Sequence, residues 1–276
     1  MARLERPGGV ELHWEERGVG PLVVLAPWWS GHPGVYEGLL SDLARDHRVV
    51  TWDARGTGES TPTGPYDMET DCSDLEAILD AAGGGAVVIG TADGANRGVH
   101  VAASREDLVA AVVALGTAPF ARTHFEGGEG MISSDTVVGA FMDMVERDYR
   151  GALRSLLAAT NTQMSEAELR ERVGFQVSYC PQEPAVARVR AWAQDDPTAA
   201  ARETGGRLWI LAAPDVAGPW LPPPQERRRL TEALIPEAHI EQGEEGTGPI
   251  SQPALAAAVI RRISAPLRAG AGERRA

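Results

Sequence analysis

Lysine is missing from this sequence: all 26 basic residues among its 276 are arginine. The absence excludes a Schiff-base lysine, a lysine-linked pyridoxal phosphate and the lysine of a phosphate-binding P-loop. Cysteine is scarce too, and Cys72 and Cys180 are better explained as unpaired thiols than as a disulfide. The six histidines lack the spacing of a zinc site, and no G-x-G-x-x-G follows a strand. We therefore expect neither a metal nor an organic cofactor.

Long apolar runs and excess positive charge are also absent. No apolar stretch is long enough to span a membrane, and the first residues form no apolar signal region. The formal net charge is −13, which repels phosphate backbones and anionic lipids. Hydrophobic residues make up 43% of the chain, enough for a sizeable core. These features predict a cytoplasmic protein with no nucleic-acid or membrane partner. A monomer or homodimer is the ordinary expectation for such a chain.

Apolar runs alternate with helical patterns along two parts of the chain. Residues 22–26, 87–90 and 108–115 are continuous apolar runs, which are typical of buried parallel strands, and a further strand is predicted over residues 207–213, which are apolar after Arg207. Apolar and polar residues alternate over residues 8–17, a pattern that predicts an antiparallel strand. The βα rhythm predicts an α/β fold, in which a mostly parallel sheet carries helices on both faces.

Between residues 118 and 205 this rhythm stops and helical patterns dominate. An apolar stripe from Asp135 to Thr160 predicts one long helix. Ser165 and Glu168 have the spacing of a capping box that opens a second helix. We predict a core formed by residues 1–117 and 206–264, a helical cap formed by residues 118–205, and a flexible tail formed by residues 265–276.

The stretch most informative about function runs from Gly90 to Gly94, where an apolar strand ends in two glycines four residues apart. Glycines at both flanks permit a sharp connection from strand to helix. The stretch resembles the nucleophile elbow, G-x-S-x-G, of the α/β-hydrolases, but Ala92 stands where that family has its serine. The sequence D-x-R-G-x-G-x-S that begins at Asp53 resembles a turn of the epoxide hydrolases and proline iminopeptidases. In that turn Asp53 and Arg55 are expected to shape the loop.

The resemblance covers residues 8–264 and implies an α/β-hydrolase fold with a helical cap. It places the acid of the catalytic triad at Asp215 and the histidine of the triad at Thr247. The triad therefore becomes Ala92, Asp215 and Thr247, which contains neither a nucleophile nor a general base. The resemblance also implies that Trp28 supplies one backbone N–H group of an oxyanion hole.

These residues define a candidate site. The N–H groups of Trp28 and Asp93 would polarise a carbonyl, and Asp93 and Asp215 would supply carboxylates. Two adjacent tryptophans and His32 form an aromatic loop at the expected pocket, with packing in the core as the alternative for each ring. The predicted catalytic residues are Asp93, Asp215 and Trp28, and the predicted substrate-binding residues are Trp29, His32, Ala92, Thr247, Phe141 and Trp192.

Three functions remain open. The first is a cofactor-free, non-hydrolytic enzyme of secondary metabolism, as the resemblance to family members without the triad permits. Such an enzyme would form carbon–carbon bonds, close rings or transfer protons on a hydrophobic, polyketide-like molecule. The second is a hydrolase in which Asp93 replaces serine, as in haloalkane dehalogenases and epoxide hydrolases. The third is a pseudoenzyme that binds a hydrophobic small molecule and returns it unchanged.

Overall fold

The fold is centred on one eight-stranded sheet with the strand order β1-β2-β4-β3-β5-β6-β7-β8. The computed structural model describes residues 2–116, 118–119, 134–160, 164–212, 223–243 and 253–273. β1, β2 and β4 pair antiparallel, and every pair from β4 to β8 is parallel. This sheet confirms the predicted α/β class. The strands are β1 (Ala2–Arg6), β2 (Val10–Arg17), β3 (Leu22–Ala26), β4 (Arg48–Trp52), β5 (Ala86–Gly90), β6 (Val109–Gly116), β7 (Leu208–Ala212) and β8 (His239–Gln242).

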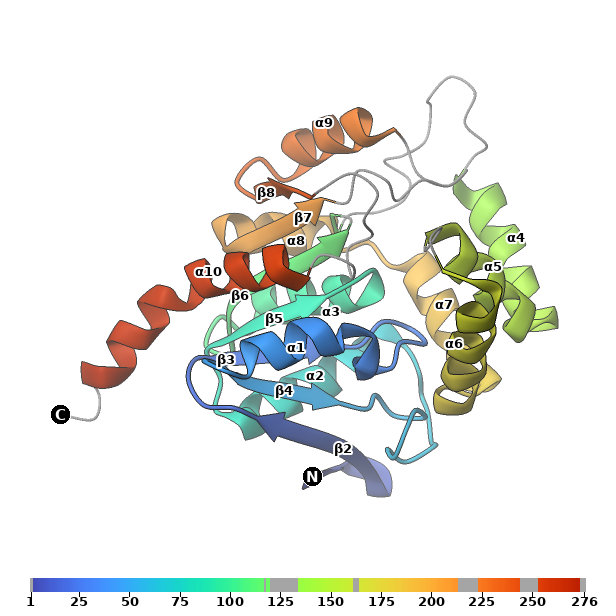
Figure 1. Ribbon diagram of the computed structural model, residues 1–276, viewed down its shortest axis with the longest axis horizontal. Helices are drawn as coiled ribbons and strands as arrows, with labels where there is room; N and C mark the ends of the chain where they lie inside the picture. Colours follow the sequence, from blue (N-terminus) through green and yellow to red (C-terminus); the bar gives the residue numbers. More distant parts are fainter. Residues whose placement is uncertain are drawn as a thin grey trace.

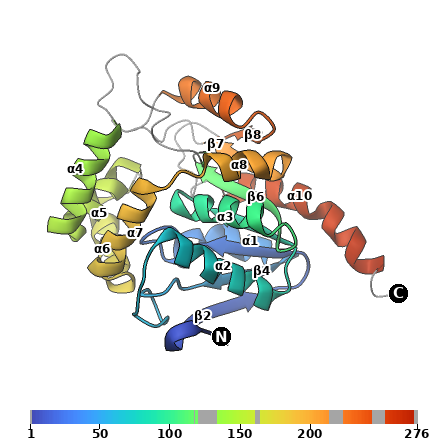
Figure 2. The ribbon, with the colours of Figure 1, turned by 180° about the vertical axis from the view of Figure 1, so that it is seen from behind.

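Helices cover both faces of this sheet (Figures 1 and 2). Side chains alternate between the faces of a strand, so Val87 and Ile89 of β5 join one hydrophobic cluster while Ala86 and Val88 join another. The first cluster includes α1 (Glu37–Leu43) and α10 (Pro253–Glu273), and the second includes α2 (Met68–Ala82), α3 (Asp93–Ser104), α8 (Thr198–Thr204) and α9 (Pro224–Leu234).

Four further helices lie beyond the carboxyl-terminal ends of β3, β5 and β6 (Figure 1). These four helices, called the cap helices below, are α4 (Ser134–Arg147), α5 (Tyr149–Thr160), α6 (Glu166–Tyr179) and α7 (Gln182–Gln194). They share a hydrophobic cluster of their own, which includes Val145, Leu153 and Val173. Trp29, from the loop after β3, is buried in this cluster as well, so the cluster joins the four helices to the core of the fold.

The helical region differs from the sequence expectation in three places. The helix predicted from Asp135 to Thr160 is two helices, because Asp148 accepts a hydrogen bond from the N–H of Gly151 at 2.9 Å and caps a new start. α8 lies within the segment predicted as cap, yet it packs on α3 of the core. α10 continues to Glu273, so residues 265–273 are helical where a flexible tail was expected. The capping box of Ser165 and Glu168 is confirmed.

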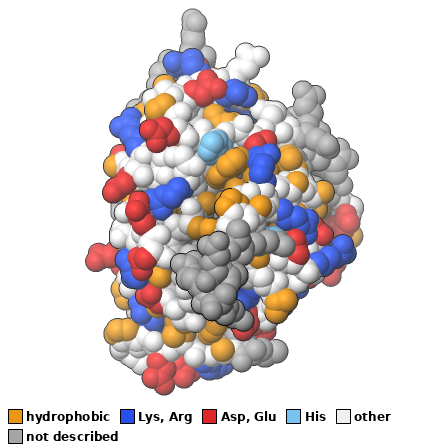
Figure 3. Space-filling view, turned by 90° about the vertical axis from the view of Figure 1, so that its left-hand side faces the viewer, with side chains coloured by type: hydrophobic (Ala, Val, Ile, Leu, Met, Phe, Trp, Pro, Cys, Tyr) orange, Lys and Arg blue, Asp and Glu red, His pale blue; other side chains and the backbone are white. Residues whose placement is uncertain are grey.

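Charge is spread over the surface rather than sorted by sign. Figure 3 shows one side of the molecule, where arginine and acidic side chains are interspersed around smaller apolar areas. Many of the described arginines pair with carboxylates, such as Arg48 with Glu16 at 2.6 Å. No helix in the described ranges combines the length and the apolarity that crossing a bilayer requires.

Candidate functional site

The sharp turn predicted after β5 is present and is built around Ala92. Its backbone angles are φ 50° and ψ −125°, and it is the sole non-glycine residue with positive φ in the described part of the chain. Positive φ brings the Cβ atom into conflict with the backbone, so a side chain here costs about 1–3 kcal/mol. The turn therefore keeps the strained geometry of a nucleophile elbow although its side chain is a methyl group.

The two flanking glycines allow this turn to pack closely. A Cβ atom on Gly90 would lie 2.5 Å from the carbonyl carbon of Gly94. A Cβ atom on Gly94 would lie 2.4 Å from the carbonyl oxygen of Ala26 in β3. Both distances are far shorter than a van der Waals contact, so neither position accepts a larger residue without movement of the backbone.

The oxyanion donors expected from the sequence come from two loops held together by one buried hydrogen bond. The N–H of Trp29 donates to Oδ1 of Asp93 at 2.9 Å. This bond brings the loop after β3 against the start of α3. Within the described residues, the N–H groups of Trp28 and Asp93 donate to no acceptor. Two unpaired donors on neighbouring loops, one at the start of a helix, suit a developing negative charge on a ligand oxygen.

The Asp93 carboxylate is buried, and both of its oxygens accept hydrogen bonds. Arg97, one turn along α3, donates to its second oxygen, Oδ2. Burial raises the pKa of the Asp93 carboxyl, and the guanidinium of Arg97 opposes that rise. The side chain of Asp93 thus ties the turn to the loop after β3 (residues 27–32), called the oxyanion loop below.

The aromatic residues predicted to bind substrate come from the oxyanion loop and from the cap helices α4 and α7. The rings of Trp28 and Trp29 meet edge to face at 5.7 Å. Trp29 is buried, and its ring lies 6.0 Å from those of Phe141 and Tyr149. Trp192, half-buried, packs on the same cluster. Packing in the cap therefore accounts for most of the Trp29 surface, while Trp28 and Phe141 remain half-buried.

His32 takes a place beside α6. Its Nδ1 accepts a hydrogen bond from the N–H of Gly34 at 2.8 Å, so the proton of the neutral ring is on Nε2. Its ring lies edge-on to Phe175 at 4.5 Å and to Tyr179 at 4.6 Å. Burial lowers the pKa of His32, against the attraction of the Asp53 carboxylate. The histidine is therefore half-buried and neutral near pH 7.

A chain of buried charges connects the elbow to the cap. Arg97 lies 3.9 Å from Asp71 of α2, and Arg188 of α7 donates to both Asp71 oxygens at 2.8 and 3.1 Å. Arg188 also donates to the carbonyl of Arg55 at 2.7 Å. Burial alone would raise the pKa of Asp71, but the guanidinium groups of Arg188 and Arg97 hold it below its usual value.

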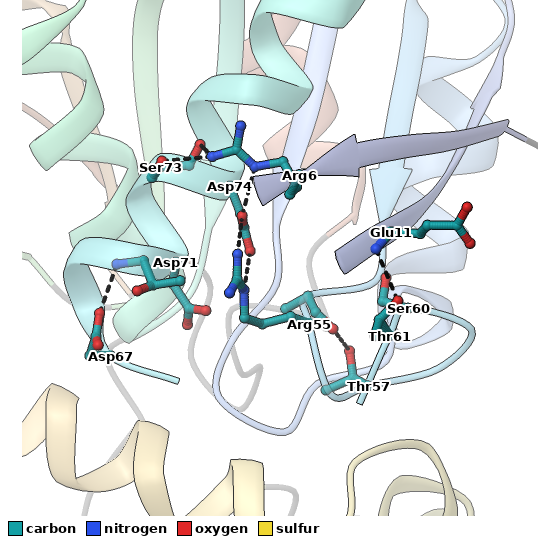
Figure 4. A network of polar contacts seen from close by, with 12 residues as sticks. Arg6, Glu11, Arg55, Thr57, Ser60, Thr61, Asp67, Asp71, Ser73 and Asp74 are labelled. Carbon is teal, nitrogen blue, oxygen red and sulfur yellow. Dashed lines mark hydrogen bonds and ion pairs between the residues drawn. The ribbon is translucent and has the colours of Figure 1, made fainter. Parts of the chain in front are cut away.

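The same chain continues through the D-x-R-G turn. Arg55 donates to both oxygens of Asp74 at 2.7 Å, and Arg6 of β1 reaches Asp74 at 3.0 Å (Figure 4). Asp53 accepts from the hydroxyl of Tyr179 at 2.7 Å. These contacts agree with the predicted structural roles of Asp53 and Arg55.

Asp215, predicted to be catalytic, and Thr247, predicted to bind substrate, lie outside the described residues, so the structure places neither of them. Among the residues that are described, no three His, Cys, Asp or Glu side chains converge on a common point. Sequence analysis missed Arg97, Asp71 and Arg188. The spacing of Asp93 and Arg97 is that of a helical ion pair and could have indicated the first. Asp71 and Arg188 are 117 positions apart, and no local pattern joins them.

Comparisons with known proteins agree with this geometry. A family model described as "alpha/beta hydrolase fold" matches residues 21–214. The chain is 37% identical over 81 residues to polyketide synthase ThaQ of Burkholderia thailandensis, a match that covers 29% of this chain and 4% of that protein. It is 30% identical over 118 residues to 2-(acetamidomethylene)succinate hydrolase of Mesorhizobium japonicum, which is 42% of each chain. The chain thus spans less than two thirds of each of these curated relatives.

Solved structures extend the similarity over the whole fold. An esterase from Exiguobacterium antarcticum has a TM-score of 0.75 and 17% identity, with 95% of this chain and 98% of that chain covered. The enol-lactonase from Burkholderia xenovorans has a TM-score of 0.69 and 19% identity, with 94% and 97% covered. At these identities the similarity shows the fold alone.

Proposed function

Because the chain belongs to the alpha/beta hydrolase fold family, we propose that it is a cofactor-free, non-hydrolytic enzyme built on that fold. Its reaction would be carbon–carbon bond formation, ring closure or proton transfer on a hydrophobic, polyketide-like small molecule. The site would use the N–H groups of Trp28 and Asp93 to stabilise an enolate or another oxyanion.

The observation that carries this proposal is the strained backbone of Ala92. An alanine gains nothing from φ 50° for its own side chain, and the conformation costs about 1–3 kcal/mol. We assign the turn one purpose, which is to present the N–H of Asp93, unpaired among the described residues, together with that of Trp28. Preorganised donors of this kind stabilise charge that develops in a transition state, whether or not a covalent bond to the enzyme forms.

Hydrolysis through Asp93 is the competing function, and the named hydrolases among the relatives favour it. A nucleophilic carboxylate must reach the substrate. The carboxylate of Asp93 is instead 2% exposed and is bonded to Trp29 and Arg97. We therefore assign that side chain to positioning the oxyanion loop. The match to a polyketide synthase over 81 residues supports a polyketide-like substrate.

A panel of acyl esters, epoxides and haloalkanes tests the proposal. We expect the unmodified chain to be inactive on all three classes, because neither serine nor histidine stands at a triad position. The variant Ala92→Ser with Thr247→His should hydrolyse esters above background if the oxyanion donors are in place. Asp93→Asn is the matched control. Turnover of any of these classes by the unmodified chain would contradict the proposal, and a covalent intermediate on Asp93 that is absent from Asp93→Asn would establish the competing hydrolase.

Poly-β-keto thioesters then distinguish an enzyme from a binding protein. The proposed enzyme should accelerate formation of a ring-closed product over the protein-free reaction, as followed by mass spectrometry. A protein that gains thermal stability from the thioester but returns it unchanged would be a pseudoenzyme, and the proposed catalysis would be wrong.

A further inference from the structure

The elbow presents two residues at its surface. From Ala86 to Val99 every residue is buried except Thr91 and Ala92, which are both half-buried. The accessible surface of this segment therefore belongs to these two residues. Ala92 offers a methyl group, so the hydroxyl of Thr91 is the polar side-chain group that this segment presents there.

Thr91 has a buried partner behind it. The hydroxyl of Tyr36 donates to Oγ1 of Thr91 at 3.0 Å, and Tyr36 itself is 2% exposed. Burial raises the pKa of Tyr36, so its hydroxyl stays protonated and remains the donor. Because Oγ1 of Thr91 accepts this hydrogen bond, the hydroxyl hydrogen of Thr91 can point toward another acceptor.

The residues that support Tyr36 and Thr91 differ from those that hold Asp93. Tyr36 belongs to the hydrophobic cluster of α1 and α10, together with Val87 and Ile89 of β5. Asp93 is held by Trp29 and Arg97. The hydroxyl of Thr91 is thus a third donor at the elbow, supported by a different set of residues from those that hold the two N–H groups.

We propose that Thr91, oriented by Tyr36, donates a hydrogen bond to an oxygen atom of the ligand and selects ligands that carry a carbonyl or enolate there. This inference depends on the proposed function, since it requires a small molecule bound over Ala92. It adds a specificity-determining side chain one position before the lost nucleophile. A ligand that lacks the oxygen leaves this hydroxyl and the two N–H groups unsatisfied, which penalises its binding.

The test compares two probes of similar shape, acetophenone and cumene, which differ chiefly in the carbonyl oxygen. Affinities are measured by quenching of tryptophan fluorescence in the unmodified chain and in Thr91→Val, Thr91→Ser and Tyr36→Phe. We expect the unmodified chain to prefer acetophenone. Thr91→Val removes the hydroxyl at nearly constant volume and should reduce that preference roughly five- to tenfold. Thr91→Ser restores a hydroxyl and should restore most of the preference.

Tyr36→Phe removes the orienting donor and leaves the Thr91 hydroxyl in place, so its loss of preference should be smaller than that of Thr91→Val. The thermal midpoint of each variant shows whether the fold is intact. An acetophenone preference that is unchanged in a folded Thr91→Val, or lost equally in Thr91→Ser, would overturn the role of Thr91 and leave the proposed function intact. Failure of the unmodified chain to bind either probe would overturn both.

Discussion

Ala92 holds a backbone conformation that its own side chain disfavours. Replacement by glycine removes the clash of Cβ at φ 50°. Part of this gain in stability is lost because glycine gives the unfolded chain more conformational entropy. We expect Ala92→Gly to raise the free energy of unfolding by about 1 kcal/mol, as measured by denaturation in urea.

The matched control for this prediction is Ala102→Gly, a buried position in α3, the helix that Ala92 precedes, where φ is not positive. That change should destabilise the protein by about 1 kcal/mol or more, since glycine is a poor helix former. If Ala92→Gly were as destabilising as its control, the strain assigned to the elbow would be absent and the main support for the proposed function would fall.

At the scale of elements, α3 lies against β3 because Gly94 has no side chain. A Cβ atom there would meet the carbonyl oxygen of Ala26 at 2.4 Å, and a backbone atom cannot rotate away. We expect Gly94→Ala to displace α3 from β3 and to lower the free energy of unfolding by about 2–3 kcal/mol.

Gly174 of α6 provides the comparison, because a Cβ atom there would have nothing within 4 Å. Gly174→Ala should raise stability by about 0.5–1 kcal/mol through helix propensity. Equal effects of the two substitutions in chemical denaturation would mean that the close approach of α3 to β3 is not what holds the elbow.

The elements that sequence analysis predicted well are those with a strong local pattern. Continuous apolar runs identified β3, β5, β6 and β7, and two glycines identified the turn at Ala92. The break between α4 and α5 escaped prediction because the apolar stripe continues across it, and a single capping aspartate, Asp148, decides the boundary. Periodicity reports which face is buried, but it does not report where one helix stops and another begins.

At the scale of the whole molecule, the candidate site depends on contacts between distant parts of the chain. The role of the Trp28 N–H was predicted from the resemblance to the α/β-hydrolases and stays a prediction. The ion pairs that join the elbow to the cap were not predicted, because Asp71 and Arg188 carry no signal in their own neighbourhoods. Charged residues in a helix usually face solvent, and only the tertiary fold shows that these are buried.

This buried chain makes a prediction about stability and pH. Asp71→Asn would leave Arg188 without its carboxylate partner, while Arg97 would keep Asp93, and breaking a buried pair in this way costs about 3–5 kcal/mol near pH 7. The pKa of Asp71 is lowered on folding, so its stabilising effect is fully present above the unfolded value of about 3.9. The effect is lost as pH falls through the lower folded value.

Denaturation of the unmodified chain and of Asp71→Asn at pH 7 and near pH 3 measures this dependence. The advantage of the unmodified chain should be large at pH 7 and should shrink at the lower pH, where protons compete for the carboxylate. Asp107→Asn is the surface control, since Asp107 also pairs with an arginine, Arg105, but remains exposed to water. A loss in Asp71→Asn no greater than that of the control, or one that grows as pH falls, would show that the buried chain does not hold the cap against the elbow. A loss that follows the predicted dependence would mean that the cap and the oxyanion loop are stabilised by one continuous set of charges.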